Sequence, residues 1–364
     1  MKFLSLIAVL LFALTAQTAF ALNCGSFDGK FCSGEAFQFG GGFSPTVGYG
    51  GFGGDNNTAS KVPVVFIHGN ADSALGWDSP TFQVPGYSKA PHSVYDHFKA
   101  AGYNDSELFG VTWLHSSEQG SDGAPDNYHQ SSKYYIIAKF IKEVKAYTGA
   151  SKVDIVSHSM GVSQTLAALE YYGTHGDIRR FVNIAGGLRG LHSCYYTGYA
   201  NPYAKTCGSQ NAYDKYVFGF FKEGWYGGVY VNNDWTGTGT RRSMRNMPGV
   251  HSGIRFYTIS AGWHDQIHCS TTTGWDYCGY GPDFNSDSNV IAQVDVGTGS
   301  YATQYDWDWA DGMLTVKDGG DIDGVGHFHS RSNTGAIIHR MLSTTCSSSC
   351  ADNYSGAYGP AYNY

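Results

Sequence analysis

Segments typical of buried strands alternate with segments of helical periodicity through the middle of the chain, and this alternation constrains the fold most. Val62–His68 reads VPVVFIH, a continuous apolar run ending at Gly69, which is typical of a strand buried on both faces. Strands that alternate with helices imply a mostly parallel central sheet with helices on both faces. Further strands are expected at Leu108–Leu114, Val153–Val156, Phe181–Ala185 and Ile254–Ser260.

Apolar residues at helical spacing lie between these strands. Ile137, Ile141 and Val144 recur three or four residues apart with Lys residues between them, and Gly149 provides a C-terminal stop. The same pattern predicts a closing helix near the C-terminus. The other expected helices carry Val94, Phe98 and Ala101; Val162, Leu166 and Leu169; and Ile337, Ile338, Met341 and Leu342.

No linker rich in Pro, Ser or Thr divides the chain, and no internal repeat is found. The sequence therefore predicts one α/β domain over residues 22–364. A large, aromatic-rich insertion is expected at about residues 186–253, between two of the predicted strands.

The N-terminus has the pattern of a secretory signal peptide. Met1 and Lys2 precede the apolar run Phe3–Leu14, and the small-x-small triplet Ala19–Ala21 follows. The alternative is a membrane anchor, but the apolar run is shorter than the roughly 20 residues that cross a bilayer. We expect cleavage after Ala21 and a secreted protein with no membrane span.

The cysteines agree with an oxidising compartment. All eight follow the expected cleavage site and form four close pairs, so local disulfides are the simplest hypothesis, although the sequence does not fix their connectivity. The pairs are Cys24–Cys32, Cys194–Cys207, Cys269–Cys278 and Cys346–Cys350.

The charge balance argues against a nucleic-acid partner. Asp and Glu number 30 and Lys and Arg 23, which gives a formal net charge of −7. A net negative chain does not offer the basic surface that a polyanion needs.

The segment Ser157–Gly161, SHSMG, stands where a buried strand gives way to a helix. It fits the G-x-S-x-G nucleophile elbow, with Ser157 in the place of the first glycine. Small residues are needed around the nucleophile because the turn is tight. The elbow predicts that Ser159 is a nucleophile at the edge of the sheet, where the helix N-terminus favours developing negative charge.

Acyl transfer also needs hydrogen-bond donors for an oxyanion. The backbone N–H of Met160, directly after the nucleophile, is one candidate. The other is the N–H of Asn70 in the segment His68-Gly69-Asn70, which follows the first strand of the pattern. The alternative is an ordinary glycine turn at a strand end.

In this architecture the acid and the histidine follow the serine in that order. Asp265 follows a predicted core strand, and His327 lies between glycines before the closing helix. We expect His327 to act as general base and acid, with Asp265 fixing its tautomer. Asp311 is a rival acid, and His329 and His339 are rival bases.

The segments HGN at 68–70, SHSMG at 157–161 and GVGHF at 324–328 resemble those of lipase-type α/β hydrolases. The wider sequence is similar to secreted polyhydroxybutyrate depolymerases that have a lipase-like serine box and no separate polymer-binding domain. That family's box usually opens with Ala or Gly, so Ser157 is a departure. The supporting segments are residues 41–54, 166–173, 185–201, 218–231 and 333–342.

The resemblance implies an α/β-hydrolase fold and a metal-free serine esterase acting on amorphous poly(3-hydroxybutyrate). It implies Ser159, Asp265 and His327 as catalytic residues and Asn70 and Met160 as oxyanion donors. No cofactor or metal is expected, the partner is an insoluble polyester or oligoester, and the protein is expected to be a monomer.

The insertion is rich in Tyr, Phe and Trp. An enzyme without a separate binding module adsorbs to an apolar polymer through its own body, and aromatic rings supply contact area at low entropic cost. Tyr213, Trp225 and Tyr230, with Tyr128 from the preceding loop, are the predicted substrate-binding residues. The alternative for each is packing within the inserted segment.

Two further segments resemble the sequence motifs of other binding sites, but neither has the setting that such a site requires. Gly48–Gly53 matches G-x-G-x-x-G but precedes a strand, so a dinucleotide site is not expected. His264–His268, HDQIH, imitates the zinc motif H-E-x-x-H but has Asp in place of Glu and a loop setting beside Cys269.

Three functions stay open at this point. The first is a polyester depolymerase. The second is a lipase, general carboxylesterase or other polyesterase, and the third is a non-catalytic polymer-binding protein in which the aromatic residues matter and Ser159 does not.

Overall fold

The structure is a computed structural model of the 364-residue chain. It describes most of the central sheet and its covering helices, together with strands of the region between β6 and α6. The described residues are 22, 37–79, 93–188, 206, 216–217, 224–226, 229–232, 241–243, 251–261, 265, 267, 284, 289–297, 304–308, 313–318 and 325–351.

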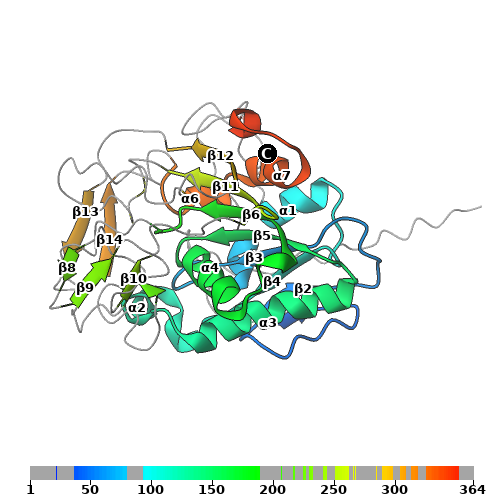
Figure 1. The fold of residues 1–364 in the computed structure, drawn as a ribbon, viewed down its shortest axis with the longest axis horizontal. Coiled ribbons are helices and arrows are strands. Elements are labelled where there is room, and N and C mark those ends of the chain that lie inside the picture. Colours follow the sequence, from blue (N-terminus) through cyan, green and yellow to red (C-terminus); the bar gives the residue numbers. More distant parts are fainter. Residues whose placement is uncertain are drawn as a thin grey trace, which may run out of the picture.

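The described core is built on an eight-stranded sheet of order β1-β2-β4-β3-β5-β6-β11-β12 (Figure 1). The β2–β4 pair is antiparallel and all other neighbouring pairs are parallel. The strands are β1 (Phe37–Phe39), β2 (Gly51–Gly53), β3 (Val64–Ile67), β4 (Leu108–Val111), β5 (Val153–His158), β6 (Ile178–Ile184), β11 (Arg255–Ser260) and β12 (Val290–Asp295).

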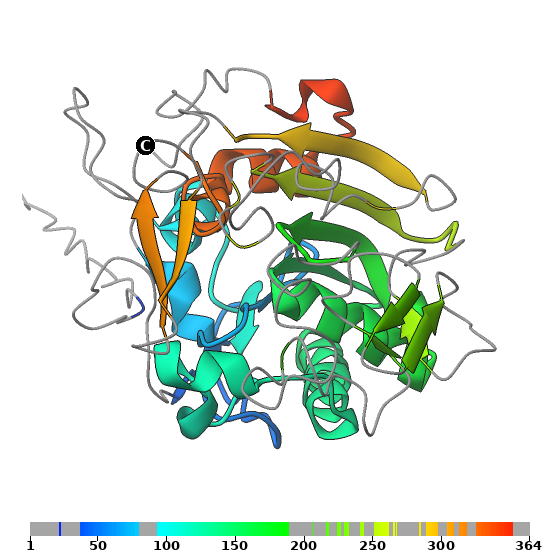
Figure 2. The ribbon, with the colours of Figure 1, turned by 90° about the vertical axis from the view of Figure 1, so that its left-hand side faces the viewer.

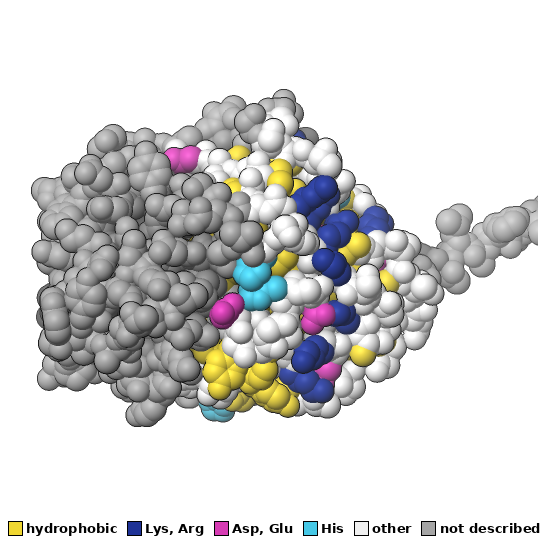
Figure 3. Space-filling view, viewed as in Figure 1, with side chains coloured by type: hydrophobic (Ala, Val, Ile, Leu, Met, Phe, Trp, Pro, Cys, Tyr) yellow, Lys and Arg dark blue, Asp and Glu magenta, His cyan; other side chains and the backbone are white. Residues whose placement is uncertain are grey.

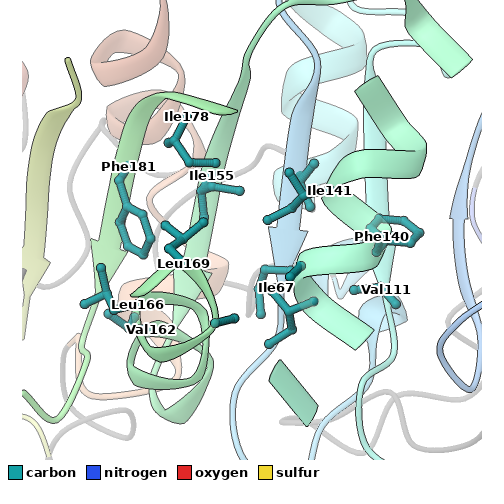
Figure 4. Close-up of a cluster of buried hydrophobic side chains, with 14 of the residues drawn as sticks. Ile67, Val111, Phe140, Ile141, Ile155, Val162, Leu166, Leu169, Ile178 and Phe181 are labelled. Atoms are coloured by element: carbon teal, nitrogen blue, oxygen red, sulfur yellow. The ribbon is translucent and has the colours of Figure 1, made fainter. Parts of the chain in front are cut away.

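Helices α3 (Ser131–Thr148) and α4 (Met160–Tyr172) cover one face of this sheet. Alternate strand residues such as Val65, Ile67 and Ile155 point to that face and pack in one cluster with the apolar stripes of the two helices (Figure 4). The helix side of the cluster includes Ile137, Phe140, Ile141, Val162, Leu166 and Leu169.

Helices α1 (Val94–Ala100) and α7 (Gly335–Ser343) cover the other face. The intervening strand residues, Val64, Phe66 and Val156 among them, belong to a second buried cluster there. The helix side of that cluster includes Val94, Phe98, Ile337, Ile338, Met341 and Leu342. The three-layer arrangement is an α/β-hydrolase fold, as predicted.

Two smaller sheets lie beyond the end of the central sheet at which β5, β6 and β11 finish (Figures 1 and 2). One has the order β7-β10-β9-β8 and the other is the hairpin β13–β14. Their strands are β7 (Tyr216–Val217), β8 (Gly224–Tyr226), β9 (Val229–Asn232), β10 (Arg241–Ser243), β13 (Gln304–Asp308) and β14 (Met313–Asp318). The first sheet lies within the predicted insertion.

Short helices form the turns around the core. They are η1 (Ala74–Asp78), η2 (Ser116–Glu118), α2 (Gly120–Gly123), η3 (Ala124–Asp126), η4 (His175–Asp177), α6 (His329–Ser332) and η8 (Ser348–Ala351). Gly149 ends α3 with φ of 70°, as the predicted stop requires.

The predicted core strands and helices are confirmed, with corrected boundaries. The strand predicted to reach Leu114 ends at Val111, and the strand predicted to end at Val156 continues to His158. The backbone of Trp113 then donates to the His68 ring, 3.1 Å between nitrogens, instead of continuing the sheet. The G-x-G-x-x-G match at Gly48–Gly53 precedes β3 as expected, and its last three residues form β2, a strand that the sequence did not predict.

Candidate active site

Ser159 lies in a strained turn at the carboxyl-end edge of the sheet, where β3, β5, β6 and β11 finish. It has φ of 54° and ψ of −130°, a conformation that non-glycine residues rarely adopt. Its N–H donates to the Ile184 carbonyl at 2.8 Å, and its carbonyl accepts from the Val162 N–H at 3.0 Å. These contacts hold the turn between the sheet ladder and α4, as in a nucleophile elbow.

The structure shows why residues in and beside the elbow must be small. A Cβ on Gly161 would lie 2.2 Å from the His68 carbonyl oxygen, and one on Gly69 would lie 3.0 Å from the Ser159 Cβ. Ser157 pairs with Ile67 and is fully buried. Its hydroxyl has no hydrogen-bond partner among the described residues, so the side chain acts there as a small space-filling group.

Ser159, His327 and Asp265 meet at this edge. His327 Nε2 is 2.9 Å from Ser159 Oγ. His327 Nδ1 is 3.0 Å from each carboxylate oxygen of Asp265. All three are buried, with 8%, 2% and 1% of Ser159, His327 and Asp265 exposed, so little water competes for these contacts.

The sheet register explains the convergence of residues more than 60 positions apart. His158, at the end of β5, is in register with Ile184 at the end of β6, which in turn pairs with Ile259 of β11. The loops after β5 and β11 therefore start at the same edge, with one strand between them. His327 joins the residues that these loops carry.

The backbone carbonyl of His327 is fixed by two contacts. The Ser330 hydroxyl donates to the His327 carbonyl at 2.8 Å, and the His158 ring Nε2 lies 3.0 Å from the same oxygen. The His158 and His327 rings lie 4.8 Å apart between centroids. His158, inside the serine box, therefore helps to hold the backbone at His327. The sequence motif did not indicate this role of His158.

Two of the three rival residues from the sequence, His339 and His329, are described. His339 lies on α7, and its ring packs against the rings of Phe98 and Tyr103. His329 is buried in α6. Asp311 lies outside the described residues. Within the described part of the chain, His327 is the ring that contacts Ser159.

The segment predicted to form the oxyanion hole is fixed by its side chains. Gly69 lies against Ser159, and the Asn70 amide donates to the Ala124 carbonyl at 2.9 Å. The Asn127 amide donates to Asn70 Oδ1 at 2.7 Å. The Asn70 peptide is thereby held beside the serine turn, although its role as donor stays a prediction.

Met160 is the first residue of α4 and is fully buried. The N–H groups of a first helical turn have no intrahelical partner, which leaves them available to an anion. Its role as the second donor stays a prediction as well.

A buried ion pair joins the loop after β3 to α6, the short helix that follows His327. Arg331, two residues into α6 from its start, donates to the carboxylate of Asp72, and the side chains are 1% and 2% exposed. Asp72 also accepts from the Ser73 N–H at 2.8 Å. The pair ties the segment after β3 to α6, a connection that no sequence motif predicts.

Two neutral histidines complete the surroundings. Burial lowers the pKa of His68 and of His129 to about 3. His129 Nδ1 is 2.7 Å from the Tyr134 hydroxyl, and its Nε2 is 3.0 Å from the Ser163 hydroxyl in the first turn of α4. Uncharged rings at these two positions add no positive charge to the surroundings of the serine turn.

The predicted substrate-binding residues are only partly placed. Trp225 and Tyr230 are a backbone register pair of the antiparallel strands β8 and β9. Tyr128 is half-buried, and its carbonyl accepts from the Gln164 amide at 3.2 Å. Tyr213 lies outside the described residues. Contact with substrate stays a prediction for all four.

The disulfide prediction is confirmed at one pair. Cys346 and Cys350 are joined in the turn after α7, with 5.0 Å between their Cα atoms. The other six cysteines, the predicted signal peptide and the histidines of HDQIH lie outside the described residues. The acid of that motif, Asp265, binds His327 instead.

This arrangement has the parts of a serine hydrolase. A hydroxyl, an imidazole and a carboxylate form a chain of hydrogen bonds, and the imidazole can accept the hydroxyl proton while the carboxylate stabilises the resulting cation. The strained turn presents the hydroxyl at the N-terminus of α4, where charge that develops on a bound carbonyl is stabilised.

Comparison with known proteins points in the same direction. Residues 61–215 match the family described as lipase (class 2), which covers the loop after β3 and the serine elbow but less than half of the chain.

Among solved structures, the mature lipase BlEst2 of Bacillus licheniformis is 15% identical over 59% of this chain and 71% of its own, with a TM-score of 0.34. Lipase B of Aspergillus fumigatus is 16% identical over 65% of this chain and 44% of its own, with a TM-score of 0.36. The carboxylesterase CesB of Bacillus subtilis is 13% identical over 80% of this chain and 86% of its own, with a TM-score of 0.36.

The family match and the chain's own elbow support an ester hydrolase of the lipase and esterase kind with an α/β-hydrolase fold. Among the described helices, none combines the length and the apolar character that crossing a membrane requires.

Proposed function

We propose that the protein is a secreted serine hydrolase that cleaves the ester bonds of amorphous poly(3-hydroxybutyrate). The observation that carries ester hydrolysis is the hydrogen-bonded series Ser159, His327 and Asp265 at the carboxyl-end edge. The polyester substrate and the secretion rest on the sequence resemblance and on the N-terminal pattern.

The proposed reaction has two halves. Ser159 Oγ attacks the ester carbonyl carbon while its proton moves to His327 Nε2. The tetrahedral oxyanion accepts from the Asn70 and Met160 N–H groups, and then collapses as the alcohol leaves with the proton from His327. Water, deprotonated by His327, attacks the acyl-enzyme and releases the acid and the free Ser159 hydroxyl.

The aromatic hairpin supports a polymeric substrate. Trp225 and Tyr230 lie on β8 and β9, in a small sheet beyond the edge that carries Ser159 (Figure 1). Residues of this aromatic type, on strands beyond that edge, suit adsorption to an apolar polymer surface.

A lipase or carboxylesterase is the second candidate. The family match to class 2 lipases favours it directly. Both candidates use the same serine chemistry and differ in the acyl and alcohol groups that they accept, so only substrate comparison separates them.

The first experiment is Ser159→Ala against wild type on a suspension of amorphous poly(3-hydroxybutyrate) and on a short soluble ester. Loss of the nucleophile should lower turnover of both by at least about a thousandfold. Ser151→Ala, the same change at an exposed position before β5, is the matched control and should keep wild-type rates. A Ser159→Ala variant that still clears the polymer would refute the serine mechanism and favour the binding-protein alternative.

The second experiment compares wild-type turnover of poly(3-hydroxybutyrate), a triglyceride and an aromatic polyester. Preference for the first supports the depolymerase. Preference for the triglyceride contradicts it and supports the lipase, without affecting the serine mechanism. N-terminal sequencing of protein recovered from the growth medium tests cleavage after Ala21.

A further inference from the structure

Three donor side chains from separate segments meet on the surface of the described core. Glu170 lies near the end of α4, His175 begins η4, and His251 precedes β11. One ligand atom from each lies within 4.8 Å of the other two. Histidine and acidic side chains gather in one place on the face shown in Figure 3.

The cluster belongs to the edge opposite Ser159. His175 precedes β6 and His251 precedes β11, so both lie at the amino ends of strands whose carboxyl ends form the catalytic edge. At about 3.3 Å per residue, the seven residues of β6 separate the two edges by roughly 23 Å. The cluster is therefore no part of the active site.

The hydrogen bonding of the cluster is incomplete. His175 Nε2 is buried and has no hydrogen-bond partner among the described residues. The nearest carboxylate oxygen, Glu170 Oε2, is 4.0 Å away, beyond hydrogen-bond distance. A buried ring nitrogen facing a carboxylate at that distance leaves room for something between them.

The two imidazoles lie face to face, with 3.7 Å between centroids and 12° between planes. His175 Nε2, unpartnered within the described part of the chain, and the Glu170 carboxyl group thus lie together at this place, with the His251 ring stacked beside them.

We propose that Glu170, His175 and His251 bind a divalent transition-metal ion, with Zn²⁺ as the best match. Two imidazole nitrogens and one carboxylate oxygen form a common zinc ligand set, and water takes a fourth position. Bond lengths of about 2.0–2.2 Å place tetrahedral ligand atoms roughly 3.4 Å apart. To reach that spacing from the present 4.8 Å limit, side-chain rotations must turn the two rings out of their stack.

The ion's effect would be on stability. It would tie the end of α4 to the start of β6 and to the point where the chain re-enters the sheet at β11 after the predicted insertion. Metal that binds the folded state alone raises stability by mass action.

The test uses tag-free protein, stripped with chelator and titrated with Zn²⁺ in a calorimeter, with thermal unfolding measured before and after. We expect one Zn²⁺ per chain and a Tm raised by several degrees. The variants His251→Ala and Glu170→Gln should each weaken binding at least tenfold and lose the rise in Tm. His115→Asn, at an exposed histidine elsewhere, should bind as wild type does.

Co²⁺ provides a second readout. A tetrahedral site gives strong visible absorption, which Glu170→Gln should diminish, because glutamine is nearly isosteric but a poor ligand. Short-ester hydrolysis should persist in every variant, which separates this proposal from the serine mechanism. Absence of Zn²⁺ binding by wild type, or equal binding by wild type and both variants, would overturn the site.

Discussion

At the carboxyl-end edge of the sheet, Gly161 lies so close to the His68 carbonyl that no side chain fits, whereas at the opposite edge Gly173 ends α4 with open space around it. Both glycines are turn residues of the same helix. Gly161 is required by the neighbouring backbone, and Gly173, with φ of 63°, only by its own conformation. The catalytic edge is thus constrained by packing and the opposite edge by local geometry.

One ion pair from each edge shows a similar difference. Asp72 and Arg331 are 2% and 1% exposed and connect two loops of the catalytic edge. Lys145 and Asp177 join α3 to η4 near the opposite edge and are 22% and 21% exposed. Burial makes the first pair costly to break and leaves the second screened by water.

The largest expected effect comes from breaking the buried pair. Arg331→Met keeps much of the side-chain volume but leaves the Asp72 carboxylate buried without its guanidinium, which should cost about 3–5 kcal/mol in the free energy of unfolding. Lys145→Met, the matched change in the exposed pair, should cost about 0–1 kcal/mol. Urea denaturation of the two variants and wild type measures both values.

Arg331→Met should also lower ester turnover, because the pair holds the loop of Asn70 and the loop of His327 together. Equal losses of stability in the two variants would show that burial does not distinguish these edges.

The central strands could be predicted from the sequence because each is buried on both faces and therefore reads as an apolar run. The edge strands could not. Gly51–Gly53 carries two glycines that allow β2 to approach β4, which gives no apolar signal. β12 has a visible alternation in its burial, but only two of its residues, Ala292 and Val294, are buried, too few to stand out from a loop.

The second expected effect is steric. Gly161→Ala places a Cβ 2.2 Å from the His68 carbonyl oxygen, so the elbow or the loop after β3 must shift, at a cost of about 1–3 kcal/mol or more. Because that shift moves Ser159 relative to His327, ester turnover should fall at least tenfold. Gly173→Ala meets no atom within 4 Å and should cost only about 1 kcal/mol, from its positive φ.

Thermal unfolding and short-ester kinetics of the two alanine variants provide the comparison. Full activity in Gly161→Ala would show that the close approach of His68 does not position the nucleophile.

The part of the site that could be predicted is the part that a sequence motif or the order of residues along the chain identifies. Ser159 follows from its elbow, and Asp265 and His327 from their places after a core strand and before the last helix; the structure brings the three together, while their catalytic roles await kinetics. The Asp72–Arg331 pair could not be predicted, since 259 residues separate its members and neither belongs to a motif.

The smallest expected effect, counted within one pH unit, concerns protons. His129, beside the first turn of α4, has a pKa lowered to about 3 by burial, and His175, at the opposite edge, one lowered to about 4. The unfolded chain takes up a proton on each ring near pH 6.5, which the folded chain resists. Each ring therefore makes the free energy of unfolding fall with decreasing pH, by up to about 1.4 kcal/mol per pH unit.

The two rings differ in the pH below which their contribution to the free energy of unfolding no longer changes. His129→Gln should flatten the pH dependence of stability from about pH 6.5 down to about pH 3, whereas His175→Gln should flatten it only to about pH 4, because the folded protein protonates His175 there. Urea midpoints at pH 6.5, 5, 4 and 3, in chelator so that no metal binds His175, give the slopes. A slope in His129→Gln as steep as in wild type would mean that the ring beside α4 is protonated in the folded state. The uncharged surroundings assigned to His327 would then be wrong.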